Sequence, residues 1–301
     1  MKKILINRKP VDGPWGGGNL FVRAICEYFK NQGWEVTHRF EEDIDVMFMQ
    51  DPRPNELGVG INEMIQYKNY RPKAKLIHRV NECDARKNTD NMDDILSQCS
   101  QFTDLTVFVS NWMRDYHIDK GWHCENTDVV YNGHNKNHFN TEGKKERKPG
   151  DPLRIVTHHW SDHRMKGADI YEFIDDFVKD KNMIYTYIGR HKCNFKNTRV
   201  VPPVSGKDLG DELKQHDVYI TGTRWDPGPN HIIEAITSGL PTYSYSQGGG
   251  ACEFTGESHV FSDTDMLSNV LTQQDFVMNN LSFDTWEKSA EKYYDLIMEI
   301  I

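Results

Sequence analysis

The chain has 301 residues and a formal net charge of −9; 37% of its residues are hydrophobic and 27% are charged. This length favours two domains, the hydrophobic content excludes a disordered chain, and the negative charge disfavours strong non-specific binding to nucleic acid. No apolar run approaches the ~20 residues that cross a bilayer, and the first residues are too weakly apolar for a signal peptide, so we expect a cytoplasmic protein without a transmembrane segment.

The first half of the chain alternates short apolar strands with helices. A strand at residues 3–7 leads through a glycine-rich loop to a helix that begins near Asn19, a residue type that favours the N-cap position. The next strand, at residues 34–38, makes this opening a β-α-β crossover with parallel strands. Further strands are predicted at residues 44–49, 76–80, 105–110 and 129–131.

A second alternation of strands and helices follows a polar segment at residues 140–152, which is rich in Gly, Pro and charge and is predicted to be a linker. Its strands are predicted at residues 153–158, 184–188 and 218–221. Repeated strand-helix units are typical of a doubly wound parallel sheet.

The pattern therefore predicts an α/β chain with two doubly wound domains. The first spans residues 1–140 and the second spans residues 151–282. A terminal helix at residues 283–301 is a candidate to cross back and pack on the first domain.

The most informative segment lies at residues 221–245, where a strand is followed by a Gly/Pro-rich loop and by a helix that starts near Asn230. In an open α/β sheet such a loop lies at the carboxyl end of its strand, where ligands bind. We expect Glu234 in the first turn of this helix, and the N–H groups of Asn230, His231 and Ile232 at its positive end, where they suit a phosphate or sugar hydroxyls.

Two carboxylates in this segment are candidates for binding a sugar. The two oxygens of Glu234 can grip neighbouring ribose hydroxyls, and Asp226 can hold hydroxyls of a second sugar. The alternative is that Glu234 complements the helix dipole and that Asp226 is a solvated turn residue.

The string that runs from Asp226 through Glu234 to the sequence SGLP resembles the E-x7-E region of retaining glycosyltransferases of family 4, with Asp226 in place of the first Glu. The resemblance implies that Asp226 orients the transferred sugar and that Glu234 binds the nucleotide ribose. It also implies a set of donor-binding residues in the loop and the helix start, namely Gly228, Pro229, Asn230, His231 and Ile232.

A second resemblance lies at residues 153–175, where the family has a strand, a basic loop and a Lys-Gly pair that opens a helix. Lys166 matches the lysine that contacts the donor diphosphate, whereas Ser161 stands where the family has an arginine. Arg164 is the candidate for that second charge, and Arg190 is added to the donor site. The alternative for Lys166 is a solvated residue at a helix start.

A third segment, residues 108–139, resembles the end of the first domain in this family, with structural roles for Asn132 and Gly133. Together the three resemblances imply a GT-B fold, in which two Rossmann-like doubly wound parallel-sheet domains face a central cleft. They also imply a retaining, metal-independent glycosyltransferase without a cofactor, for which a UDP- or GDP-sugar is the favoured donor.

The acceptor is left open between a saccharide, a small molecule and a modified nucleic-acid base. Two other functions also stay open: a GT-B epimerase or hydrolase of nucleotide-sugars, and a non-catalytic module that binds nucleotide-sugars. Turnover without an acceptor would indicate the epimerase or hydrolase, and binding without nucleotide release would indicate the module.

The first half holds further candidates. Gly17 and Gly18, in the glycine loop, are predicted to face the donor across the cleft, or else to form a turn. His78 and Arg79, at the end of a strand, are candidates for the cleft lining or for the core. The stretch at residues 66–87 holds seven Lys/Arg and two acids, so it either binds an anionic acceptor, nucleic acid included, or forms a solvated face, which we favour.

Overall fold

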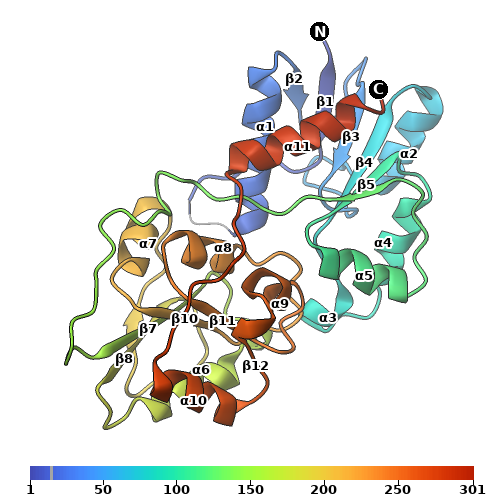
Figure 1. Ribbon diagram of the computed structural model, residues 1–301. Coiled ribbons are helices and arrows are strands. Elements are labelled where there is room, and N and C mark those ends of the chain that lie inside the picture. The colour runs from blue at the N-terminus through green and yellow to red at the C-terminus, as the bar shows by residue number, and fades with distance from the viewer. Residues whose placement is uncertain (14–15) are drawn as a thin grey trace. The chain divides into compact units, whose positions relative to one another are not determined.

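The computed structural model describes residues 1–13 and 16–301 and divides the chain into two α/β units (Figure 1). Unit 1 combines Met1–Gly133 with Asp284–Ile301, and unit 2 is His134–Phe283. Pro14 and Trp15 of the predicted glycine loop lie outside the described residues. On this division the predicted linker belongs to unit 2.

Unit 1 contains a six-stranded sheet in which every neighbouring pair is parallel. The spatial order is β2-β1-β3-β4-β5-β6. Its strands are β1 (Lys3–Ile6), β2 (Glu35–Thr37), β3 (Val46–Met49), β4 (Lys75–Val80), β5 (Leu105–Phe108) and β6 (Thr127–Val129). β3 and β5 are buried along their whole length, as expected for a parallel sheet that is covered on both faces.

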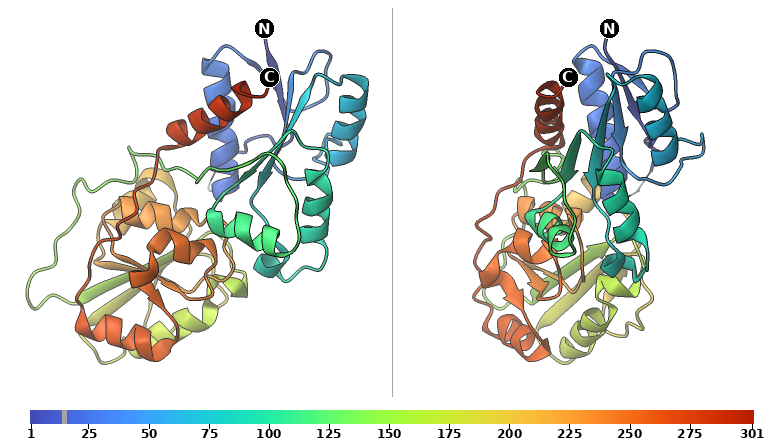
Figure 2. Two further views of the ribbon diagram at one scale, coloured as in Figure 1. Left: turned by 45° about the vertical axis from the view of Figure 1, so that its right-hand side comes forward. Right: turned by 90° about the vertical axis from the view of Figure 1, so that its right-hand side faces the viewer.

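Helices cover both faces of this sheet, as Figure 2 shows for α1 and α11 on one side and α2 on the other. The described helices of the unit are α1 (Gly17–Asn31), α2 (Ile61–Tyr70), α3 (Asp84–Lys87), α4 (Met92–Ser100), α5 (Asn111–Asp119) and α11 (Trp286–Met298). The terminal helix α11 packs beside α1, with Tyr293 and Ile297 in the same apolar core as Phe21 and Ile25.

The predicted N-cap role of Asn19 is wrong. α1 begins at Gly17 with Gly16 as its N-cap, and Asn19 lies in the first turn. The Asn19 side chain accepts a hydrogen bond from the Val11 N–H (2.7 Å) and donates one to the Val11 carbonyl (2.8 Å). It therefore fastens the preceding loop to the helix instead of capping it.

Unit 2 contains a second six-stranded parallel sheet, in the order β12-β11-β10-β7-β8-β9. Its strands are β7 (Leu153–His159), β8 (Met183–Gly189), β9 (Arg199–Val201), β10 (Val218–Thr221), β11 (Thr242–Tyr245) and β12 (Val260–Phe261). Its helical segments are η1 (Arg164–Lys166), α6 (Ala168–Phe177), α7 (Gly206–Leu213), α8 (Asn230–Thr237), α9 (Gly250–Thr255), η2 (Glu257–His259) and α10 (Thr264–Gln273). α6 and α10 pack on one face of the sheet, and α7 and α8 pack on the other.

Across residues 1–13 and 16–301, no helix combines the length and the apolar character needed to cross a membrane.

Buried neutral histidines predict that the fold loses stability in acid. Burial lowers the pKa of His78 to about 3 and that of His117 to about 4 in unit 1, and it lowers the pKa of His216 to about 4 in unit 2. The unfolded chain binds these protons near pH 6.5, whereas the folded chain excludes them. The stabilisation is therefore complete above about pH 6.5 and is lost as the pH falls toward 4, by about 1.4 kcal/mol per pH unit for each histidine.

Urea unfolding between pH 7 and pH 4.5 measures this dependence. The variant His78→Leu should flatten it by one histidine's share, because both ring nitrogens of His78 are buried without a hydrogen-bond partner. The matched variant His123→Gln changes an exposed histidine and should leave the slope unaltered. An unchanged slope in His78→Leu would show that His78 takes up no extra proton on unfolding.

Candidate functional site

The strand order of unit 2 places a ligand-binding edge between β7 and β10. The chain leaves β7 toward β8 and β9, and it returns on the other side of β7 as β10. At such a reversal the two loops that follow the neighbouring strands diverge to opposite faces of the sheet and leave a crevice at their carboxyl ends. Here those loops are residues 160–167 and 222–229. Six predicted site residues lie in them: Ser161, Arg164, Lys166, Asp226, Gly228 and Pro229.

The two loops touch through their backbones at paired glycines. Gly167 has φ +99°, and a Cβ atom placed on it would lie 2.4–2.6 Å from backbone atoms of Gly222. The Arg224 N–H donates to the Met165 carbonyl (2.8 Å), and the Arg224 guanidinium bonds both carboxylate oxygens of Asp169 (2.8 and 2.6 Å). These contacts fix the position of Lys166 against the loop that carries Asp226.

Lys166 and Asp226, both predicted site residues, form an ion pair. The Lys166 ammonium donates to Asp226 Oδ2 at 2.5 Å, and the Thr223 hydroxyl donates to the same oxygen at 3.4 Å. The Asp226 side chain is 5% exposed and that of Lys166 is 18% exposed. The Asp226 N–H bonds the Gly248 carbonyl (3.0 Å), so the loop after β11 also holds the carboxylate in place.

The prediction that Glu234 lies in the first turn of its helix is wrong. The helix, α8, begins at Asn230, and Glu234 is its fifth residue. Its Oε2 bonds His158 Nε2 at 2.9 Å, and both side chains are about 90% buried. Among the described residues, none donates to Oε1. One oxygen of Glu234 is thus engaged by His158, and the other is available to a ligand.

His158 is a site residue that sequence reasoning missed. It is the last residue but one of β7, the strand next to β10 in the sheet, and its side chain reaches the helix that follows β10. The contact requires the tautomer with the proton on Nε2, because a carboxylate only accepts hydrogen bonds. His158 could have been found from the sequence as a polar residue near the carboxyl end of a strand.

The neighbouring histidine, His159, has a different role. Its Nε2 bonds the Tyr171 hydroxyl (2.5 Å), which in turn accepts the Gly222 N–H (3.1 Å). Burial, together with nearby His231 and Lys166, lowers the pKa of His159 well below its usual value and keeps it neutral. Within the described parts of the chain, no three His, Cys, Asp or Glu side chains are grouped to hold a metal ion.

The start of α8 offers fewer N–H groups than predicted. The Ile232 N–H donates back to the Pro229 carbonyl (3.1 Å), and the Ile232 side chain is fully buried in the core. The predicted ligand role of that N–H group is therefore wrong. The Pro229 and His231 side chains are buried, and His231 Nε2 contacts Thr221 Oγ1 (3.1 Å), so His231 supports the end of β10.

The remaining predicted donor residues lie around the loop after β7. Arg164 is exposed, and among the described residues no carboxylate pairs with it. Arg190 lies over the Trp160 ring, with 4.0 Å between the guanidinium carbon and the ring centroid. The Ser161 hydroxyl accepts the His163 N–H (3.3 Å) and so shapes the loop.

The structure places His78 and Arg79 inside unit 1, not on its surface. His78 has no exposed area, and Arg79 is 1% exposed. The Arg79 guanidinium donates hydrogen bonds to Asn132 Oδ1 (2.6 Å) and Gln50 Oε1 (3.3 Å). It also lies over the Phe21 ring, with 3.9 Å between the guanidinium carbon and the ring centroid. Both residues therefore belong to the core, which is the second of the two alternatives that the sequence left open.

Asn132 thus accepts a hydrogen bond from buried Arg79, and Gly133 permits another close approach. A Cβ atom on Gly133 would lie 2.5 Å from backbone atoms of Thr285 and Trp286, where α11 begins.

Most cations of the basic stretch at residues 66–87 are paired with nearby carboxylates. Examples are Lys68 with Asp104 (2.5 Å) and Arg71 with Asp43 (2.9 Å).

Two doubly wound units with parallel six-stranded sheets constitute the GT-B fold, so the predicted fold class is confirmed. Among solved structures the chain is similar to Anabaena HepE in complex with UDP and glucose, with TM-score 0.72, 11% identity and 99% of each chain covered. It is also similar to sucrose-phosphate synthase from Thermosynechococcus elongatus, with TM-score 0.70 and 13% identity over 100% of this chain and 99% of that one.

A third similar structure is WaaG, a glycosyltransferase involved in lipopolysaccharide biosynthesis, with TM-score 0.60 and 13% identity over 97% of this chain and 95% of that one. At this level of identity the likenesses show a shared fold alone. No family model matches the sequence, and no curated protein matches it.

Proposed function

We propose that this chain is a glycosyltransferase that moves a sugar from a nucleotide-sugar to a hydroxyl acceptor, with the donor bound at the β7/β10 edge of unit 2. The observation that carries the proposal is that the Lys166–Asp226 pair and the Glu234–His158 pair both lie at the topological switch point of one sheet. The similar fold of HepE, whose structures hold UDP, glucose or UDP-glucose, supports a UDP-sugar as the first donor to test.

The donor diphosphate requires positive charge, and the pairing of Lys166 affects where that charge comes from. Because Asp226 already neutralises Lys166, the pair is close to neutral as a whole. Arg164, without a carboxylate partner in the described chain, supplies the uncompensated cation, and Lys166 donates hydrogen bonds from a fixed position. The positive end of α8 adds a favourable dipole.

Asp226 and Glu234 then bind the two sugars of the donor. Asp226 lies beside the lysine and orients hydroxyls of the transferred sugar, while the available Oε1 of Glu234 accepts from the nucleotide ribose. Departure of the nucleoside diphosphate leaves an oxocarbenium-like sugar, and the charge that develops on the leaving group is stabilised by these fixed cations and dipoles. On the basis of the family resemblance we propose that no metal takes part and that the anomeric configuration of the sugar is retained. NMR of the product tests the configuration.

The test is a nucleotide-release assay with UDP-, GDP- and ADP-sugars, with and without hydroxyl acceptors and with chelator present. Release from one donor that depends on an acceptor is the expected result. Release that is indifferent to acceptors would indicate an epimerase or hydrolase instead, and donor binding without any release would indicate a binding module.

Glu234→Gln tests the ribose contact. Loss of a charge-assisted hydrogen bond costs about 1.5–3 kcal/mol, so the Kd for the nucleotide should rise roughly tenfold to a hundredfold. His158→Gln should have a smaller effect of the same kind, because His158 acts through Glu234. Glu257→Gln, at an exposed carboxylate of the same unit, is the matched control and should bind as the wild type does. Equal affinity in all four proteins, measured by calorimetry, would contradict the assignment.

A further inference from the structure

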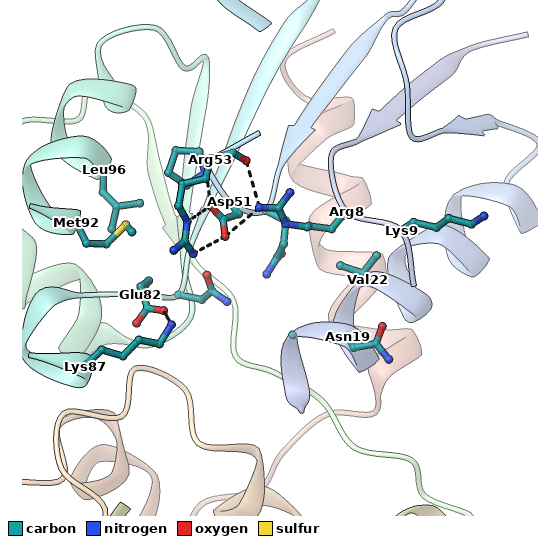
Figure 3. Close-up of a pocket in the computed structure, with 14 residues that line it drawn as sticks. Arg8, Lys9, Asn19, Val22, Asp51, Arg53, Glu82, Lys87, Met92 and Leu96 are labelled. Carbon is teal, nitrogen blue, oxygen red and sulfur yellow. Dashed lines mark hydrogen bonds and ion pairs between the residues drawn. The ribbon is translucent and has the colours of Figure 1, made fainter. Parts of the chain in front are cut away.

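Unit 1 has a pocket of its own at the corresponding edge of its sheet. The strand order β2-β1-β3 reverses direction between β1 and β3, which is where ligands bind in open α/β sheets. The pocket has a volume of about 290 Å³ and is lined from three neighbouring strand ends and from the start of α1 (Figure 3). Representative residues are Arg8 after β1, Gln50 and Asp51 after β3, Asn81 after β4, and Gly18 in α1.

The pocket is positively charged in a chain of net charge −9. Four basic side chains line it (Arg8, Lys9, Arg53 and Lys87) against two acidic ones (Asp51 and Glu82). This excess of two positive charges favours an anionic ligand.

Asp51 orients two of the cations. Arg53 bonds both of its carboxylate oxygens (2.9 and 2.7 Å), and Arg8 lies 3.1 Å from Oδ2 (Figure 3). The two guanidiniums therefore converge on one carboxylate and keep one positive charge in excess at a fixed position. Guanidiniums fixed in this manner can offer their remaining N–H groups to a phosphate or carboxylate group.

Two amide side chains add polar groups that the protein does not use. Gln50 is 8% exposed and its Oε1 accepts from Arg79, but among the described residues nothing accepts a hydrogen bond from its Nε2. That nitrogen lies beside the first turn of α1, 3.8 Å from the position a Cβ would take on Gly18. The Asn81 side chain likewise makes no hydrogen bond within the described chain. A buried amide that lacks a partner inside a pocket points to a ligand that supplies one.

Apolar side chains also line the pocket: Met92 and Leu96, both from α4, and Val22 from α1. The volume lies at the lower limit of the roughly 300–1,000 Å³ typical of small-molecule sites, so it suits one monosaccharide-sized group whose ring packs on apolar side chains.

We propose that this pocket binds the acceptor and that the acceptor is a small hydroxyl compound carrying an oxyanion group, a phosphate or a carboxylate, held by Arg8 and Arg53. That the ligand is the acceptor rests on the proposed function. Binding of the anion itself rests only on the pocket.

The experiment measures the affinity of the full chain for inorganic phosphate, glucuronate and glucose, by thermal shift and calorimetry. Phosphate or glucuronate should bind and glucose should not; the tighter of the two anions identifies the group. Arg53→Gln and Lys87→Gln change exposed side chains of the pocket. Arg53→Gln removes a contact and should weaken the affinity for the anion about tenfold or more, whereas Lys87→Gln removes only a neighbouring positive charge and should weaken that affinity less. Arg71→Gln removes a comparable ion pair outside the pocket and should change nothing.

Phosphate can also enter a nucleotide site, so only the affinity that Arg53→Gln removes is assigned to unit 1. Equal anion binding in wild type, Arg53→Gln and Lys87→Gln, or an equal loss in Arg71→Gln, would overturn the proposal. UDP binding in the same proteins distinguishes failure of the pocket proposal from failure of the proposed function. If UDP binds and no anion affinity depends on Arg53, the pocket assignment fails alone; if UDP does not bind, the proposed function fails while the anion site stands on its own result.

Discussion

Replacing Asp226 by asparagine or Lys166 by methionine is expected to lower the rate of sugar transfer roughly 10²- to 10³-fold, the loss typical when one fixed electrostatic contact to a transition state is removed. The two single variants should also be less stable than the wild type. The Asp226 side chain is 5% exposed, and removal of Lys166 takes this cation away from the buried Asp226 carboxylate.

The double variant Lys166→Met/Asp226→Asn separates stability from catalysis. With both charges gone no unpaired ion is buried, so the free energy of unfolding should return toward that of the wild type. The transfer rate should stay low, because neither group can act on the donor. Recovery of activity together with stability would mean that the pair is only structural.

A second buried ion pair in the same unit is a matched control. Arg154 bonds both carboxylate oxygens of Asp217 (2.6 and 3.0 Å) at the amino end of β7, and both side chains are 11% exposed. Arg154→Met and Asp217→Asn should lose stability in urea unfolding. Their affinity for the nucleotide, measured on the folded protein, should equal that of the wild type.

The alternation of strands and helices could be predicted from the sequence, because apolar strands and amphipathic helices depend on local pattern. Three strands escaped prediction, and all are short: β9 has three residues that are mostly exposed, β11 has four, and β12 has two. Such segments carry no periodic signal, and they become strands only because a neighbouring strand is already in place.

The site could be predicted in part for a related reason. Lys166 and Asp226 were found as members of motifs, whereas the contact of His158 with Glu234 joins residues 76 positions apart and exists because β7 lies beside β10. The sequence predicts parallel strands but not which strand lies beside which. Arg79 is a similar case, since the sequence left it open between the cleft lining and the core. Its partners Asn132 and Gln50, which hold it in the core, are distant in the sequence.

Gly167→Ala is expected to destabilise unit 2 by about 3 kcal/mol or more and to abolish sugar transfer. Two separate effects contribute. An alanine at φ +99° costs about 1–2 kcal/mol in backbone strain. Its methyl group would also lie 2.4–2.6 Å from the Gly222 backbone, so the loops after β7 and β10 must move apart.

Gly143→Ala measures the first effect, the backbone strain, on its own. Gly143 also has positive φ (+72°), but a Cβ atom placed on it meets nothing within 4 Å, so its substitution costs only the backbone strain. Urea unfolding of both variants gives the difference that is due to the Gly222 contact. Since that contact sets the position of Lys166 against Asp226, Gly167→Ala should also lose nucleotide affinity while Gly143→Ala keeps it. Equal destabilisation in the two variants would mean that the loops adjust to the methyl group without separating, and Lys166 would then owe its position to Arg224 and its contacts with Met165 and Asp169 instead.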